Sequence, residues 1–111
     1  MQGYLIINRH KDGTQDERQE LRPAHVAWIT SGGEGRVGVL TGAPTLDEDA
    51  AREGNFFVVE ARSREAVQGF VAGDPFMQAG LVAQSSVLLL RPPFDPDTIA
   101  QGLSPRLPAG G

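Results

Sequence analysis

Two side chains of this sequence, His25 and Asp74, are of the types that transfer protons and could act together. The chain has two histidines and no cysteine, which excludes thiolate nucleophiles, disulfides and cysteine-based zinc sites. His25 falls on the apolar side of an expected helix, one turn after Leu21 and just before Trp28. An imidazole has an ordinary pKa of about 6.5, so it can act as a general acid or base near neutrality. The same position also suits a neutral core histidine that is hydrogen-bonded to a carbonyl group.

Asp74 stands immediately before Pro75, at the end of a second expected helix that begins after Ser63 and ends at Gly73. Proline disfavours the helical conformation in the residue before it but suits the first position of a new helix. Asp74 is therefore expected to cap a turn, which stabilises a helix by about 1 kcal/mol. Its other interpretation is a partner for His25, whose ring a carboxylate would orient. The two roles are compatible, because a carboxylate has several lone pairs.

The elements that must position these residues follow from hydrophobic periodicity. Short apolar runs predict four strands, over Tyr4–Ile7, Arg36–Thr41, Phe56–Val59 and Ser86–Leu90. A helical pattern with early acidic residues begins near Asp16 and ends at Gly32-Gly33. Pro23 interrupts this pattern, so it predicts either a kink or a regular helix that starts only near Arg22.

The order β-α-β-β-α-β predicts an α+β protein of the ferredoxin-like type, with both helices on one face of a four-stranded sheet. A sheet with one wet face should alternate apolar and polar residues, but three of the strands are apolar on both faces: Leu5–Ile7, Phe56–Val59 and Val87–Leu90. Left uncovered, the second face would be a large exposed apolar patch. We therefore expect a homodimer in which two sheets pack face to face, a dimeric α+β barrel.

Composition excludes several classes of function. A chain of 111 residues suits one domain, and a formal net charge of −4 argues against binding nucleic acid. The RNA-recognition motif has the same order of elements, but Glu53, Asn55 and Glu60 stand where that motif carries basic or aromatic residues. No apolar run reaches membrane-spanning length and no signal-peptide pattern is present, so we expect a cytoplasmic protein without membrane contact.

The remaining polar clusters are interpreted as structural. The acidic segment Asp47-Glu48-Asp49 lacks the ligand spacing and the glycine of a calcium-binding loop. With two histidines and no cysteine, no transition-metal site is expected. The sequence of residues 32–35 fits neither of the common phosphate-binding patterns. His10 lies in a polar segment, residues 8–13, which is expected to leave the first strand, and its side chain is expected to be solvated.

Three short segments of the chain resemble the YciI-like, or YCII-related, family. They are Arg22-Pro23-Ala24-His25 with Val26 and Trp28, Thr41-Gly42-Ala43-Pro44, and Asp74-Pro75-Phe76 ahead of Ala79-Gly80. The likeness runs from the first strand to about Pro93. It gives a YciI-like domain over residues 1–94 and a C-terminal tail, residues 95–111, that is expected to be loose or laid over a neighbour.

The resemblance implies a dimeric α+β barrel and an active-site pair, which on this chain is His25 and Asp74. One characterised branch of the family eliminates chloride from a chlorinated hydroxyquinol, and lactone isomerases share the barrel architecture. The expected function is thus a small cofactor-independent enzyme acting on a small, cyclic or aromatic organic molecule. His25 would move a proton and Asp74 would orient it, giving an elimination or an isomerisation.

Four further residues are expected to border the substrate. Phe76 and Trp28 would wall the pocket, and Gly42 would lie beside the ligand in the turn after the second strand. Arg22 would hold an anionic group of the substrate or, equally, be an ordinary surface residue. The alternative function is a non-catalytic dimeric binding or regulatory module, in which His25 and Asp74 serve the structure.

Overall fold

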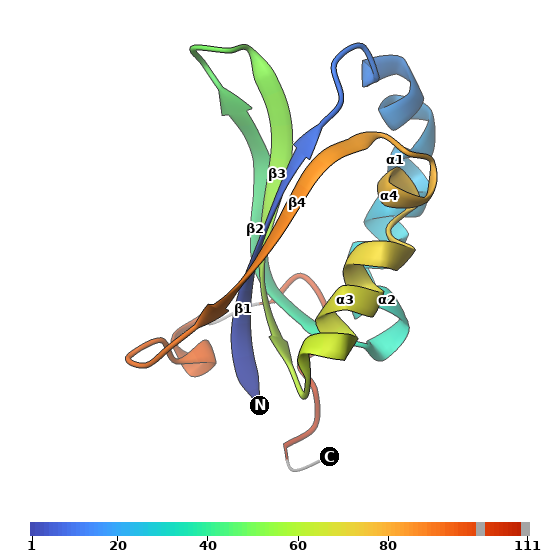
Figure 1. The fold of residues 1–111 in the computed structure, drawn as a ribbon. Helices are drawn as coiled ribbons and strands as arrows, with labels where there is room; N and C mark the ends of the chain where they lie inside the picture. The colour runs from blue at the N-terminus through green and yellow to red at the C-terminus, as the bar shows by residue number, and fades with distance from the viewer. Residues whose placement is uncertain (100–101, 110–111) are drawn as a thin grey trace.

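The computed structural model describes residues 1–99 and 102–109, in which one antiparallel sheet is covered by helices on one face (Figure 1). The strands pair in the order β2–β3–β1–β4. The elements along the chain are β1 (Gln2–His10), α1 (Gln15–Thr30), α2 (Gly32–Gly35), β2 (Gly38–Asp47), β3 (Arg52–Ala61), α3 (Arg64–Gly73), α4 (Pro75–Gln78), β4 (Val82–Leu90) and a 3-10 turn, η1 (Pro96–Thr98). This arrangement confirms the predicted ferredoxin-like α+β fold.

Three of the strands extend beyond the apolar runs that predicted them, because polar residues continue the pairing. The second strand instead begins at Gly38 rather than Arg36 and continues to Asp47, so Gly42, expected in a turn after the strand, lies within β2. In β1, Asn8 lies opposite Asn55 of β3 and Ser85 of β4, and the strand ends only at His10. The Asn8 Nδ2 atom donates to Asn55 Oδ1 at 2.8 Å, so the inward-facing polar side chains partly satisfy one another. The prediction that the chain leaves the first strand at Asn8 is therefore wrong for residues 8–10.

The ends of the helices follow the predicted signals. Ser63 caps α3, since its Oγ atom accepts from the Ala66 amide at 3.1 Å. The long helix α1 ends at Thr30, just before the two glycines, and Gly33 takes the left-handed conformation with φ of 62°. Pro23 lies inside α1, which begins at Gln15, so the alternative of a helix that starts near Arg22 is wrong. The acidic segment after β2 forms a hairpin turn, in which Asp47 Oδ1 accepts from the Asp49 amide at 3.1 Å.

The face of the sheet that carries the helices is apolar at one end and polar at the other. Its apolar end holds the core, with Ile6, Val59 and Val67 fully buried. Its polar end holds buried His10 and Asn55 beneath the N-terminal half of α1. Strand alternation explains this gradient, because every second residue of β1 and β3 points to the helices whether it is apolar or polar. The candidate site lies at the polar end.

In the part of the chain that the structure describes, no α-helix lies on the opposite face of the sheet, where Phe94 and Arg106 of the C-terminal segment cover one end at Gly3 and Glu60 (Figure 1). By alternation it presents Leu5 and Ile7 of β1, Phe56 and Val58 of β3, and Leu88 of β4. Ile7 is 44% exposed and Leu88 is 52% exposed in the isolated chain. The prediction that these strands are apolar on both faces is thus confirmed for a single copy of the chain.

The described part of the C-terminal tail is attached to the sheet. Ser104 Oγ accepts from the Val39 amide at 2.8 Å, so the tail runs along the edge strand β2. Arg106 forms an ion pair at 2.8 Å with the carboxylate of Glu60, which is 1% exposed. Of the two expectations for the tail, loose or laid over a neighbour, these residues follow the second, because a buried carboxylate and an edge-strand amide hold them against the sheet. Residues 100–101 and 110–111 of the predicted tail lie outside the described residues.

Candidate active site

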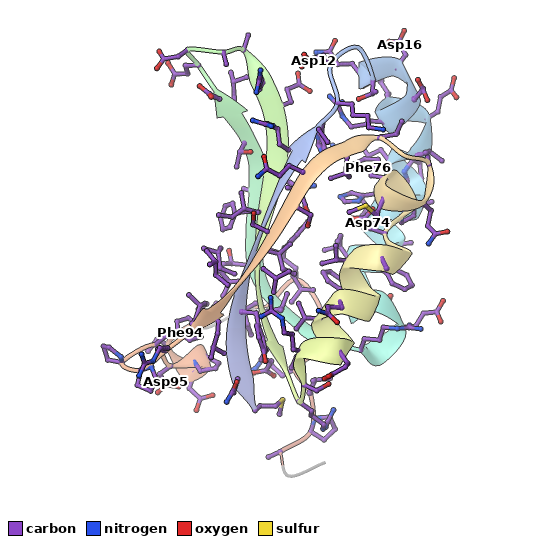
Figure 2. The ribbon with its side chains drawn as sticks, viewed as in Figure 1. Asp12, Asp16, Asp74, Phe76, Phe94 and Asp95 are labelled. Atoms are coloured by element: carbon purple, nitrogen blue, oxygen red, sulfur yellow. The ribbon has the colours of Figure 1, made fainter. Side chains whose placement is uncertain are left out.

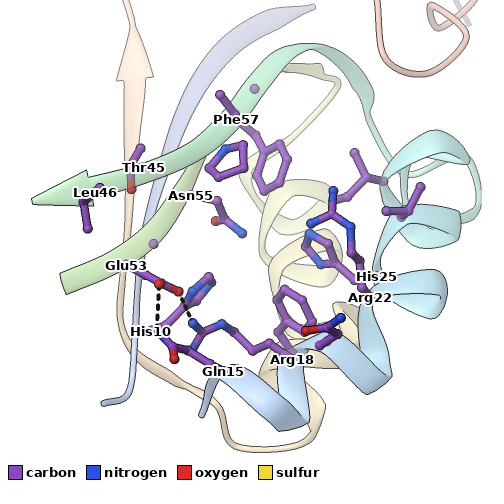
Figure 3. A pocket seen from close by; sticks show the side chains of 18 of the residues that line it. His10, Gln15, Arg18, Arg22, His25, Thr45, Leu46, Glu53, Asn55 and Phe57 are labelled. Atoms are coloured by element: carbon purple, nitrogen blue, oxygen red, sulfur yellow. Dashed lines mark hydrogen bonds and ion pairs between the residues drawn. The ribbon is translucent and has the colours of Figure 1, made fainter. Parts of the chain in front are cut away.

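A cavity of about 1030 Å³ lies between α1 and the sheet (Figure 3). The helix contributes Arg18, Arg22 and His25 to its wall, and β2 contributes the stretch from Gly42 to Leu46. The floor is formed by His10 of β1, by Glu53, Gly54, Asn55 and Phe57 of β3, and by Phe76 of α4. The volume is large enough for a small organic ligand, and both polar and aromatic groups face it.

His25 and Asp74 meet beside this cavity. The Nδ1 atom of His25 lies 2.8 Å from Oδ1 of Asp74, and the two side chains are 12% and 11% exposed. A carboxylate can only accept, so Nδ1 is the donor and Nε2 is left as an acceptor. No residue of the described chain is hydrogen-bonded to Nε2, and His25 lines the cavity. The basic nitrogen is therefore the one available to a ligand.

Asp74 also performs the structural role that its position predicted. The same Oδ1 atom accepts from the Phe76 amide at 2.9 Å and so caps α4, which starts at Pro75. Figure 2 labels Asp74 and Phe76 at this short helix. Capping and contact with His25 thus occur together rather than as alternatives. The cap fixes the position of the Asp74 carboxylate at the start of α4. The contact with this carboxylate therefore sets the orientation of the His25 ring.

Two phenylalanines hold the His25 ring from its sides. The ring of Phe76 stacks on the imidazole, with the centroids 4.0 Å apart and the planes 5° from parallel. Phe57 lies 6.2 Å away at a tilt of 50°. Both phenylalanines are buried, which excludes water from much of the ring. Phe76 lines the cavity, in the place expected for it.

Of the other residues expected at the site, Arg22 and Gly42 line the cavity and Trp28 does not. Arg22 is exposed and has no ion-pair partner in the described ranges 1–99 and 102–109. At Gly42 a Cβ atom would lie 2.5 Å from the ring of Phe57, so the absence of a side chain at Gly42 makes room for this ring. The indole of Trp28 instead donates to the Phe70 carbonyl at 2.9 Å, and its role is to pack α1 against α3.

Arg18 and Glu53 are site residues that the sequence analysis did not identify. Arg18 is only 8% exposed and forms an ion pair with Glu53, whose other carboxylate oxygen accepts from Gln15 Nε2 at 2.8 Å (Figure 3). This bridge ties the first turns of α1 to β3 at one end of the cavity. The sequence feature that indicates a site role for Arg18 is its helical spacing. Arg18, Arg22 and His25 recur on one face of the helix at intervals of four and three residues.

His10 contradicts the expectation of a solvated side chain. It is 8% exposed, lines the cavity and meets the edge of Phe76 with the ring centroids 5.6 Å apart. Burial, followed by the charges of Arg18 and His25, lowers the pKa of His10 to about 4. The unfolded chain would bind a proton on His10 near pH 6.5, whereas the folded chain does so only near pH 4. Stability is therefore reduced as the pH falls through this interval.

The described residues offer no group of three or more histidine or acidic side chains placed to hold a metal ion. Over residues 1–99 and 102–109, no helix is both long and apolar enough to cross a bilayer. The side chains that line the cavity offer imidazole, carboxylate, amide, guanidinium and aromatic groups. These groups are suited to proton transfer and to binding a polar ring.

Comparison with known proteins identifies relatives of this chain. The family model of the YCII-related domain matches residues 2–91. The proteins named YciI from Escherichia coli O6:H1 (strain CFT073) and from Shigella flexneri are each 30% identical over 89 residues, which cover 76% of this chain and 91% of theirs. Among solved structures, the chain is similar to the 5-chloro-2-hydroxyhydroquinone dehydrochlorinase of Burkholderia phenoliruptrix AC1100, in complex with 2,5-dihydroxybenzoquinone. The TM-score is 0.68 at 30% identity, with 80% of this chain and 93% of the other covered.

Proposed function

Because this chain belongs to the YCII-related domain family, as its three motifs indicated, we propose that it is a cofactor-independent enzyme acting on a small oxygenated ring. His25 accepts and returns a proton through Nε2, and Asp74 orients the ring and stabilises its protonated form. The observation that carries the proposal is the 2.8 Å contact between Nδ1 and Asp74, which leaves Nε2 for the cavity.

The reaction class that suits this pair is an elimination or an isomerisation. In an elimination of hydrogen chloride, Nε2 takes a proton from the substrate and the carbon–chlorine bond breaks, with its electron pair leaving as chloride. No electrons pass between the ring and an outside group. The reaction therefore needs a group that accepts a proton, but no external oxidant or reductant. In an isomerisation, the same nitrogen would return the proton at a second position of the ring.

Two features support an oxygenated ring as the substrate. Phe57 and Phe76 give the cavity aromatic walls, and Arg22, which has no ion-pair partner within the described residues, brings a positive charge that suits an ionised ring oxygen. The dehydrochlorinase that resembles this chain acts, by its name, on a chlorinated hydroxyhydroquinone, and its structure holds a dihydroxybenzoquinone. We extend that class of ring to this chain as part of the proposal.

We further propose that two copies associate through the helix-free face of the sheet. Leu5, Ile7, Phe56, Val58 and Leu88 form a continuous apolar surface across three strands. Burial of such a surface against a second copy would remove it from water, at about 25 cal/mol per Å² of apolar area. A two-fold arrangement lets this face complement itself.

A turnover assay with 5-chloro-2-hydroxyhydroquinone tests the proposed activity. Under anaerobic conditions we expect the protein to release chloride faster than buffer does, in proportion to protein concentration, with the ring product followed by NMR. Ring signals of His25 should shift when 2,5-dihydroxybenzoquinone is added. If this compound binds but no chlorinated or lactone ring is converted, the enzymatic proposal is wrong and the protein is a binding module.

A further inference from the structure

The polar end of the cavity contains an imidazole without a hydrogen-bond partner. Both ring nitrogens of His10 are buried, and neither has a partner among residues 1–99 and 102–109. An unpaired buried polar atom destabilises the fold, whereas a leucine of similar size would fill the same space without that cost. A buried group of this kind calls for an explanation outside the packing of the core.

The location of His10 connects it to the proposed reaction site. His10 and His25 contact the same phenyl ring, that of Phe76, and both line the cavity. Asn55, on the neighbouring strand, lines it as well. The Oδ1 atom of Asn8, two residues before His10 on the same face of β1, is also buried and has no hydrogen-bond partner in the described part of the chain. Among the described residues with such unpaired buried atoms, His10 is the one that lines the cavity.

The surroundings of His10 decide which ligand group it can bind. Arg18 and His25 of α1 oppose a positive charge on the ring, while Glu53 of β3 and Asp74 before α4 favour it. Burial is the largest effect and opposes the charge, so the ring is neutral at pH 7. A neutral imidazole offers one N–H donor and one acceptor nitrogen. It suits an uncharged hydroxyl or carbonyl group better than a carboxylate or phosphate.

We propose that His10 is a second ligand-binding histidine of this cavity, which hydrogen-bonds an uncharged hydroxyl or carbonyl substituent of the ring that reaches His25. This inference rests on the proposed function and adds the requirement of a second oxygen substituent on the substrate. His25 then holds the reacting end of the ring and His10 holds the other substituent. His10 is thereby a positioning and specificity-determining residue of the site.

The test is a thermodynamic cycle between a ligand hydroxyl group and the His10 ring. Dissociation constants of phenol and of the three dihydroxybenzenes are measured by NMR for the wild type and for His10→Leu. We expect at least one dihydroxybenzene to bind the wild type roughly fivefold more tightly than phenol does, the effect of one neutral hydrogen bond. In His10→Leu this difference should vanish, and in His10→Gln, which keeps a donor and an acceptor, part of it should return.

A matched control is Ser85→Ala. The Oγ atom of Ser85 is also buried without a partner in the described chain, but Ser85 does not line the cavity. Both His10→Leu and Ser85→Ala should leave the melting temperature equal or higher, while only His10→Leu should change ligand binding. If the advantage of the second hydroxyl survives in His10→Leu, the inference is wrong while the proposed function stands. If none of the rings binds or shifts the His25 signals, the proposed function fails and this inference fails with it.

Discussion

Replacement of His25 by glutamine is expected to lower turnover by about 1,000-fold, since positioned proton transfer contributes 100- to 10,000-fold. Glutamine can still hydrogen-bond to Asp74, but its amide cannot accept and return a proton at neutral pH. The loss should fall on kcat, with dissociation constants for unreactive rings changed little. The measurement is steady-state kinetics with the substrate identified by the chloride-release assay, together with a melting curve that shows whether the variant is folded.

Asp74 provides the matched variants for this experiment. Asp74→Asn keeps a side chain that can cap α4, so it should retain stability while turnover falls by about 10- to 100-fold through loss of the charged partner. Asp74→Ala also loses the cap and should destabilise the fold by about 1 kcal/mol. A His25→Gln protein that turns over at the wild-type rate would rule out the proton-transfer role.

Introduction of a charge into the helix-free face is expected to dissociate the protein into monomers. Leu88 is 52% exposed in the isolated chain and lies beside Leu5 on that face. In a face-to-face dimer, Leu88→Asp would bury unpaired carboxylates, which costs several kcal/mol. A cost of about 3 kcal/mol weakens association by roughly 100-fold. Sedimentation velocity over a concentration series should show a wild-type dimer and a Leu88→Asp monomer.

The next residue of the same strand supplies the control. Leu89 is 45% exposed, close to the value for Leu88, but it alternates to the opposite side of β4, where it pairs with Tyr4. Leu89→Asp should therefore leave the assembly unchanged. A wild-type protein that sediments as a monomer at micromolar concentration would contradict the proposed dimer, as would a Leu88→Asp protein that remains a dimer.

Features set by local chemistry could be predicted from the sequence. The cap at Ser63, the break between Gly73 and Pro75, and the end of α1 before Gly32-Gly33 depend on residues close in the chain. The ferredoxin-like order and the two apolar faces of the strands followed from periodicity alone. For these features, local preference and the final fold agree.

The polar end of the site could not be predicted from local sequence signals or periodicity. Asn8 and His10 continue the alternation of β1, but polar residues after an apolar run are typical of a loop, so the sequence predicts a loop at these positions. Arg18 was overlooked because a charged residue on a helix is usually exposed. The neighbours of both His10 and Arg18 are set by the tertiary fold, since Glu53 lies far from them in the chain.

Trp28 illustrates a different limit. It lies about one turn after His25 on α1, and its type suits a pocket wall, but at that level of the helix the neighbouring element is α3, to whose Phe70 carbonyl the indole donates. There a Cβ atom at Gly73 would lie 2.4 Å from the indole, so the glycine and the ring fit each other. A helical pattern gives the direction of each side chain around the helix axis, but it does not show which other element of the fold packs against that direction.

The central claim is that Asp74 holds His25 with its proton on Nδ1, so that Nε2 is the basic atom at the cavity. Long-range ¹H–¹⁵N spectra of histidine-labelled protein identify the tautomer directly, at a pH where the ring is neutral. We predict that His25 is protonated at Nδ1 in the wild type and that this preference is lost in Asp74→Ala. Protonation of the wild-type ring at Nε2, or a tautomer that does not change in Asp74→Ala, would contradict the account.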